Sequence, residues 1–340
     1  MPSVWRDWLD RKKLSNASRF VKTSTLWGWI SGGVVLGVLR WLWGAVLTLV
    51  ALQPVAVGAV DRSVLVLGRI SDDPKAHYDQ LKPLLDYVVP RMREVGIVEG
   101  RILMAKDAQQ MGSYLRRGRV DWVTETAGTA MALGQRAGAR PLLLTERNGV
   151  GSYHSVFFVR RDSPVTSLEG LRGRTLAMQS ALSTSAYLVP AMELLDHDVQ
   201  PEILLDPRDT PVEDSVGYVF VRSELNISTY VHKRVVDAGV ISSIDWSDNQ
   251  AMPPAFRQDM RVLYRSEPIP RAVEMVRADL DPLVRDRLQQ VLLQASSDPL
   301  AGPALAKFFG TTGFHPVDPD NLRALERLRR GLARIRMEVE

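Results

Sequence analysis

The feature that most limits the fold of this chain is an alternation between short apolar runs and apolar residues at helical spacing. Residues 63–69 form a β-branched run that is typical of a strand, and residues 78–95 carry apolar side chains every three or four positions, as a helix does. Strands that alternate with helices predict α/β units with mostly parallel sheets. The first set of predicted elements continues with strands at 101–105, 120–123 and 141–144 and helices at 108–117 and 126–137.

The alternation then occurs a second time. A strong strand at 153–160 precedes a second set with strands at 175–178, 217–221 and 238–241 and helices at 185–195 and 226–233, and a strand at 261–264 follows. A chain of 340 residues exceeds the usual size of one domain, so two lobes are expected. We predict lobe 1 at 60–155, lobe 2 at 156–245, and a return to lobe 1 with C-terminal helices at 246–340, with crossovers at the strands 153–160 and 261–264.

The first 59 residues differ from the rest. Six of the eight tryptophans lie before residue 44, and the apolar run 41–52 is followed by Pro54 and by small residues up to Ala59. This pattern is typical of a signal peptide cleaved after Ala59. Two alternatives stay open. One is an uncleaved membrane anchor, since residues 26–52 are long enough to span a hydrocarbon core of ~30 Å. The other is that the true translation start lies downstream, so that about the first 35 residues are not part of the protein. All three place the folded part in the periplasm.

Charge and composition exclude several classes of function. The first 59 residues hold seven basic and two acidic residues, so the remainder of the chain, at −1, is nearly neutral and offers no concentrated basic patch for nucleic acid. The absence of cysteine excludes disulfides, zinc–thiolate sites and a lipidated N-terminal cysteine. The five histidines show no metal-ligand spacing, and no P-loop or nucleophile elbow is present. We therefore predict no catalysis, no metal and no cofactor.

Four stretches, in this order, resemble the periplasmic phosphate/phosphite/phosphonate-binding proteins of ABC transporters. They are a strand followed by Ser71-Asp72-Asp73-Pro74, then Val120-Asp121-Trp122, then Tyr153-His154-Ser155-Val156, and then Ser183-Thr184-Ser185 with Pro190. The similarity spans about residues 64–293. It implies a type II periplasmic binding fold with two lobes joined by a double crossover, a small anionic ligand held between them, hinge closure on binding, and an ABC permease as partner.

Ser183, Thr184 and Ser185 are the first candidate ligand groups. They lie just before a helical pattern, and a helix N-terminus offers free N–H groups and the positive end of the dipole to an anion. In the family this stretch grips the oxyanion. An ordinary N-cap is the alternative interpretation, because serine and threonine are preferred there in any helix.

The chain also departs from the family. It has Ala186 where glycine is usual, Glu125 where an aromatic residue is common, and Glu224 where histidine often follows serine. A carboxylate beside a bound dianion is repulsive, so either a ligand ammonium group meets these acids, or Arg69 or another base neutralises them, or the ligand is not phosphate-like. Solvent-facing acids are the remaining alternative.

His77 and Tyr78 are expected to wall the cleft, and Tyr153 to face it from the hinge. The predicted ligand-binding residues are Ser183, Thr184, Ser185, Glu125, Thr126, Ser223, Glu224, Tyr78 and Tyr153.

The sequence therefore predicts a periplasmic solute-binding component of an ABC transporter that takes a small oxyanion, with an amine-bearing phosphonate as one candidate. The alternative is a membrane-anchored sensor or adaptor that signals ligand binding to a membrane partner through the segment 26–52.

Overall fold

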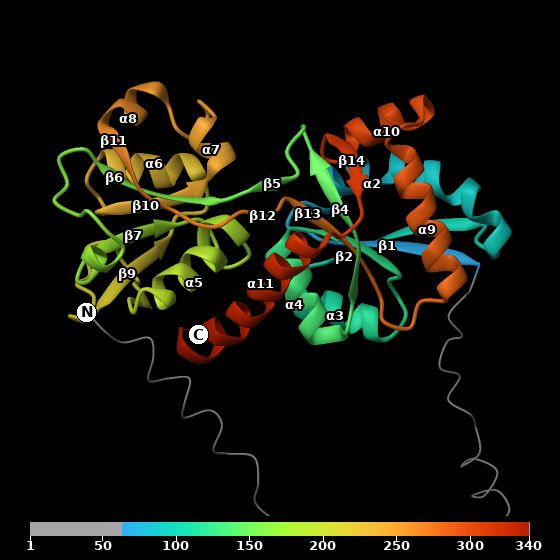
Figure 1. The fold of residues 1–340 in the computed structure, drawn as a ribbon, viewed down its shortest axis with the longest axis horizontal. Coiled ribbons are helices and arrows are strands. Elements are labelled where there is room, and N and C mark those ends of the chain that lie inside the picture. Colours follow the sequence, from blue (N-terminus) through green and yellow to red (C-terminus); the bar gives the residue numbers. More distant parts are fainter. Residues whose placement is uncertain (1–62, 340) are drawn as a thin grey trace, which may run out of the picture. The chain divides into compact units, whose positions relative to one another are not determined.

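A computed structural model describes residues 63–339 (Figure 1). The predicted signal or anchor segment at 1–59 lies outside the described residues. So does its apolar stretch 26–52, through which the alternative sensor or adaptor would signal. None of the helices between residues 63 and 339 combines the length and the apolar character needed to cross a bilayer.

Lobe 1 is built on a six-stranded sheet with the order β14-β4-β13-β3-β1-β2. Strands β2, β1 and β3 run parallel, whereas β13 runs antiparallel between β3 and β4, and β14 runs antiparallel to β4. The strands are β1 (Val64–Ile70), β2 (Glu99–Ala105), β3 (Trp122–Glu125), β4 (Arg140–Arg147), β13 (Ala272–Val276) and β14 (Thr311–His315). The helical elements of this part of the chain are α2 (Pro74–Val88), η2 (Val89–Val95), α3 (Ala108–Arg116), α4 (Ala127–Ala137), α9 (Pro282–Ala295), η5 (Pro299–Ala301) and α10 (Gly302–Lys307).

Lobe 2 holds a second six-stranded sheet with the order β11-β6-β10-β7-β9-β8. Strands β10, β7, β9 and β8 run parallel, and β6 runs antiparallel to both β10 and β11. The strands are β6 (Ser155–Arg160), β7 (Thr175–Met178), β8 (Gln200–Ile203), β9 (Ser215–Phe220), β10 (Ala238–Ser242) and β11 (Met260–Arg265). Its helical elements are η3 (Glu169–Leu171), the π-helical turn η4 (Thr184–Leu188), α5 (Val189–Asp196), α6 (Glu224–His232), α7 (Ser243–Ser247) and α8 (Pro254–Asp259).

Two short strands link the sheets. β5 (Ser152–Tyr153) and β12 (Ile269–Pro270) pair antiparallel, with Tyr153 opposite Ile269 (Figure 1). The crossovers are therefore shorter than the predicted strands 153–160 and 261–264, most of which belong to β6 and β11. Because β11 pairs with β6 in the second sheet, lobe 2 extends to Arg265, beyond the predicted boundary at 245.

Both sheets are mixed rather than mostly parallel, because the chain crosses between the lobes twice. On its return it adds β13 and β14 to the lobe 1 sheet in antiparallel orientation.

Strand β13 was not predicted from the sequence because Glu274 lies in the middle of the strand. This carboxylate is fully buried and accepts hydrogen bonds from Trp122 Nε1 at 2.5 Å, Thr124 Oγ1 at 2.8 Å and Thr145 Oγ1 at 2.6 Å, which compensate its desolvation.

Helix α11 (Pro319–Glu338) contacts both lobes. It packs on α4 of lobe 1 and on α5 of lobe 2. Gln135 Nε2 of α4 donates to the Arg329 carbonyl at 2.5 Å, and the Arg334 guanidinium donates to Asp196 at the end of α5 at 2.7 Å. The buried leucines and isoleucine of α11 join one hydrophobic cluster that includes residues of both sheets.

Candidate functional site

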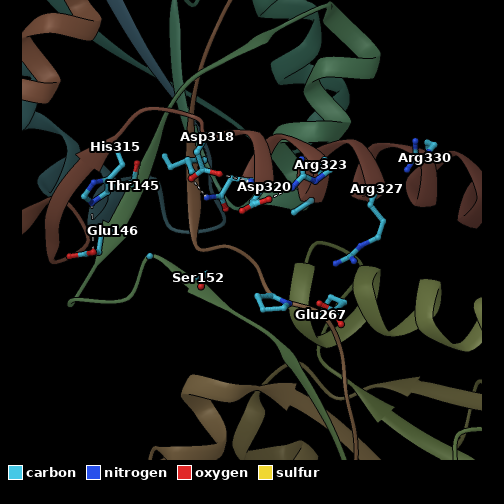
Figure 2. A pocket seen from close by; sticks show the side chains of 15 residues that line it. Thr145, Glu146, Ser152, Glu267, His315, Asp318, Asp320, Arg323, Arg327 and Arg330 are labelled. Carbon is cyan, nitrogen blue, oxygen red and sulfur yellow. Dashed lines mark hydrogen bonds and ion pairs between the residues drawn. The ribbon is translucent and has the colours of Figure 1, made fainter.

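Two hollows are considered within residues 63–339. One, the inter-lobe cleft, has a volume of about 440 Å³ and is lined by loops at the carboxyl ends of strands from both sheets. The other, the hinge pocket, has a volume of about 870 Å³ and is lined by β4, by the segments next to β5 and β12, and by α11 (Figure 2). Ligands of open α/β sheets bind beyond the carboxyl ends of the strands, which favours the inter-lobe cleft.

Parallel strands β1 and β3 end side by side and bring Arg69 and Glu125 to the lobe 1 wall of the cleft. The Arg69 guanidinium donates to the Thr124 carbonyl at 2.8 Å and to Glu125 at 3.5 Å. The other carboxylate oxygen of Glu125 accepts the Ile70 N–H at 2.8 Å. Glu125 is therefore neutralised by Arg69, one of the alternatives that the sequence left open.

The hydroxyl run 183–185 lies at the start of the helical segment formed by η4 and α5, on the lobe 2 wall. Ser183 is the N-cap and accepts the Ala186 N–H at 3.1 Å. Thr184 is buried and bonds to lobe 1, where it accepts the Gly128 N–H at 3.1 Å. The cap that was the alternative interpretation is thus present at Ser183, within a segment that lines the cleft.

Tyr153 and Arg271 reach the cleft from the hinge. The Tyr153 side chain shares a hydrogen bond with Ser185, and burial raises the pKa of Tyr153 above its ordinary value. The Arg271 guanidinium lies 5.1 Å from the centre of the Tyr153 ring. A protonated phenol and a guanidinium are both hydrogen-bond donors, so this end of the cleft suits an anion.

Glu224 is the second acid of the cleft and has a different environment. It is the first residue of α6. Burial raises the pKa of Glu224, the hydrogen bond from its own N–H partly opposes this rise, and the charge of Asp245 adds to it. Asp245 also lines the cleft and accepts the Ser242 hydroxyl at 2.5 Å. Two neighbouring carboxylates make this part of the cleft suitable for a hydrogen-bond donor or a cation.

His77 also lines the cleft. Its Nδ1 lies 2.7 Å from the Ser71 hydroxyl. Burial, and then the charge of Arg69, lower the pKa of His77. The imidazole is therefore held neutral at neutral pH.

A second arginine lies behind Arg69. The guanidinium carbons of Arg69 and Arg147 lie 4.6 and 4.5 Å from the centre of the Phe309 ring, within range of cation–π attraction. Burial, and then the charge of Arg69, lower the pKa of Arg147 to about 9, so it remains cationic at neutral pH. The Nε atoms of both arginines are buried and lack a hydrogen-bond partner among the described residues.

Seven of the nine predicted ligand-binding residues line the cleft, and Ser223 and Tyr78 do not. Ser223 caps α6 by accepting the Asn226 N–H at 3.2 Å, and the Tyr78 side chain is 45% exposed on α2. The seven that converge are Glu125, Thr126, Tyr153, Ser183, Thr184, Ser185 and Glu224.

Sequence reasoning missed Arg271, Lys106 and Asp245 as lining residues. Arg271 directly follows Pro268-Ile269-Pro270, a further stretch that resembles the family, so its position next to that stretch was the available signal. No cluster of three metal-ligating side chains occurs within residues 63–339.

The hinge pocket has a different lining. Figure 2 shows Arg323, Arg327 and Arg330 along α11, and His315 beside Glu146. Arg323 pairs with Asp320 on its own helix, and His315 lies 3.7 Å from Glu146. Four acidic residues and three arginines line the same walls, so the hinge pocket offers no single sign of charge to a ligand.

The comparisons with known proteins agree with this geometry. The family model for the periplasmic substrate-binding protein of phosphonate ABC transporters matches residues 68–322. No curated protein matches the chain.

Several solved structures are similar to this chain. XAC2383 from Xanthomonas citri, bound to chloride ion, is 60% identical, with 82% of this chain and 100% of that chain covered and a TM-score of 0.77. The same protein bound to ATP gives 59% identity, the same coverage and a TM-score of 0.76. PhnD1 from Prochlorococcus marinus in complex with methylphosphonate is 15% identical, with 81% and 100% covered and a TM-score of 0.57, and shows the fold alone.

The family binds solutes for transport and is not a family of enzymes, and it implies a periplasmic location, a small anionic ligand and an ABC permease as partner. The chain belongs to the family of periplasmic substrate-binding proteins of phosphonate ABC transporters.

Proposed function

We propose that the protein captures an organic phosphate or phosphonate in the inter-lobe cleft and delivers it to an ABC permease. The observation that carries this proposal is the convergence of hydroxyl groups from lobe 2 with arginines from lobe 1 and the hinge. Ser183 and Ser185 face the same cleft as Arg69 and Arg271. Charge-assisted hydrogen bonds from arginine and hydroxyl donors are the strongest contacts available to a phosphoryl oxygen.

The size of the cleft supports a ligand larger than inorganic phosphate. Its volume of about 440 Å³ lies in the range of sites for small organic molecules. The relative from Xanthomonas citri was solved with ATP bound, at 59% identity to this chain. A phosphoryl group attached to an organic part is therefore the ligand class that we propose.

The acids of the cleft refine this proposal. Glu125 is already paired with Arg69 and bonded to the Ile70 N–H. Glu224, beside Asp245, has no side-chain partner among the described residues. We assign to Glu224 the recognition of a hydrogen-bond donor on the organic part of the ligand, such as an amine.

A calorimetric titration tests the proposal with phosphate, methylphosphonate, 2-aminoethylphosphonate, ATP, sulfate and chloride as probes. We expect at least one organic phosphate or phosphonate to bind more tightly than phosphate, sulfate or chloride, and to raise the melting temperature by mass action. Binding of sulfate or chloride alone, or of none of the six, would contradict the proposal.

The Arg271→Ala variant tests whether the anion binds in the inter-lobe cleft. Its side chain is not part of a hydrogen-bond network that holds the fold, since the described contact is the stacking on Tyr153. If the anion binds in the cleft, this variant loses affinity while its melting temperature without ligand stays near that of the wild type.

A further inference from the structure

Helix α4 of lobe 1 begins in the inter-lobe cleft without a cap from its own N-cap residue. The backbone of Thr126 has the extended N-cap conformation, but its side chain makes no capping hydrogen bond to α4. The first N–H groups of any helix have no acceptor within the helix. An acceptor from elsewhere in the molecule is therefore needed to satisfy the buried start of α4.

The acceptor comes from the other lobe. Thr184 Oγ1 accepts the Gly128 N–H at 3.1 Å and donates to Thr126 Oγ1 at 3.0 Å. Thr126 Oγ1 in turn donates to Thr129 Oγ1 at 3.4 Å. The hydroxyl proton of Thr184 is therefore engaged in a contact between the lobes, because a hydroxyl has only one proton to donate.

Gly128 is what lets the two lobes come this close. A Cβ atom at this position would lie 2.6 Å from Leu188 Cδ1 and 2.8 Å from Thr184 Oγ1, shorter than such contacts allow. Gly128 is the second residue of α4 and has an ordinary helical backbone. Alanine is the better helix former, so the close approach of Leu188 and Thr184 is the feature here that requires glycine.

We propose that the contact of Thr126 and Gly128 with Thr184, which we call the inter-lobe latch, holds the two lobes closed and is built from protein atoms alone. The inference goes beyond the proposed function, since the latch acts whatever anion the cleft takes. It also separates Thr184 from its two serine neighbours. Ser183 accepts the Ala186 N–H and keeps its hydroxyl proton for the ligand, and Ser185 is hydrogen-bonded to Tyr153 at the hinge, whereas Thr184 joins the lobes.

The latch has a consequence for affinity. A ligand that is held by both lobes binds fully only in the closed arrangement, and its apparent Kd rises as the population of that arrangement falls. Removal of one hydrogen bond of the latch is expected to weaken binding about fivefold. Removal of the close approach itself is expected to weaken it further.

The distance between the lobes tests the inference directly. The chain has no cysteine, so Leu300→Cys in lobe 1 and Leu205→Cys in lobe 2 provide two labelling sites; these side chains are 77% and 99% exposed. Spin labels at both sites report the inter-lobe distance by pulsed electron resonance in the purified protein without added ligand.

We expect Gly128→Ala to shift the distance distribution to longer values most strongly, and Thr184→Val to shift it less. Thr184→Ser keeps the hydroxyl and should match the wild type. Thr229→Val is the matched control, because Thr229 bonds only within its own helix, to the Leu225 carbonyl. Unchanged distributions in both Gly128→Ala and Thr184→Val would overturn the inference.

ATP titrations of the same variants separate this inference from the proposed function. If no phosphorus ligand binds the wild type while Gly128→Ala still lengthens the distance, the proposed function fails and the latch stands. If ATP binds and the distances do not respond, the latch fails and the proposed function stands.

Discussion

The inter-lobe cleft and the hinge pocket differ in which polar groups of their walls lack a partner. The hinge pocket is the larger, but its charged groups lie near the surface, Arg323 already pairs with Asp320, and Glu146 accepts a hydrogen bond from the Thr312 hydroxyl. The smaller inter-lobe cleft holds Arg69 and Glu224 in partly buried positions. Exposed ion pairs are worth little, whereas a buried polar group without a partner is costly.

This contrast shows why volume alone does not locate the binding site. A ligand gains most where it supplies partners to groups that folding has already desolvated. The Nε atom of Arg69, a residue that lines the cleft, is such a group, because it is buried without a hydrogen-bond partner among residues 63–339. Loss of a cleft residue should therefore weaken binding far more than loss of a hinge-pocket residue.

The largest effect is expected for Arg271→Ala. A hydrogen bond to a charged group contributes about 1.5–3 kcal/mol, so the Kd for ATP should rise by roughly ten- to a hundredfold. Calorimetry measures the change, and Arg271→Lys should recover part of the affinity because it keeps the charge and loses the planar fork. An unchanged Kd in Arg271→Ala would place the anion outside the cleft.

Tyr153→Phe should have a smaller effect. The variant removes the hydroxyl that is hydrogen-bonded to Ser185, and a neutral hydrogen bond contributes about 0.5–1.5 kcal/mol. A rise in Kd of about fivefold is expected. If the melting temperature falls and the Kd stays constant, Tyr153 only supports the fold at the hinge.

The fold of the cleft walls was largely predictable, and the part that escaped has a physical reason. Periodicity marked β1, β3 and the helix after residue 183 because each buries a regular apolar face. β13 escaped because the buried Glu274 breaks its apolar pattern, and only the partners Trp122, Thr124 and Thr145 from neighbouring strands make that carboxylate acceptable.

The candidate site also has a part that the sequence indicates and a part that only the fold brings together. The serine–threonine run could be seen in the sequence because all its members are adjacent. The pairing of Glu125 with Arg69, residues that are 56 positions apart, depends on β1 and β3 lying side by side. The role of Thr184 between the lobes depends on Gly128, which no local pattern connects to it.

Glu224→Gln should change the pH dependence of stability in a defined direction. Burial raises the pKa of Glu224 in the folded protein. A raised pKa means that the carboxylate destabilises the fold above the folded-state pKa, and that this cost disappears once the pH falls below the ordinary value near 4.5. The variant should therefore melt at a higher temperature than the wild type at pH 8 and at the same temperature at about pH 4.

A lower melting temperature of the variant at pH 8, with equal melting temperatures at about pH 4, would instead show that Glu224 is stabilised as a carboxylate by a partner. The ligand gives a second readout. Binding of 2-aminoethylphosphonate should weaken in Glu224→Gln, and binding of methylphosphonate should change little, because only the first carries the ammonium group that Glu224 is proposed to meet.

The smallest effect is expected in the hinge pocket, for Arg327→Ala combined with Arg330→Ala. Both residues belong to α11 and line this larger hollow (Figure 2). Neither forms an ion pair with a residue of the described range, so their removal leaves no buried charge behind. The double variant should bind ATP with a Kd within about twofold of the wild type, since a distant surface charge contributes at most a few tenths of a kcal/mol. A loss as large as that of Arg271→Ala would mean that the phosphoryl groups bind at the hinge, and the roles assigned to the two hollows would have to be exchanged.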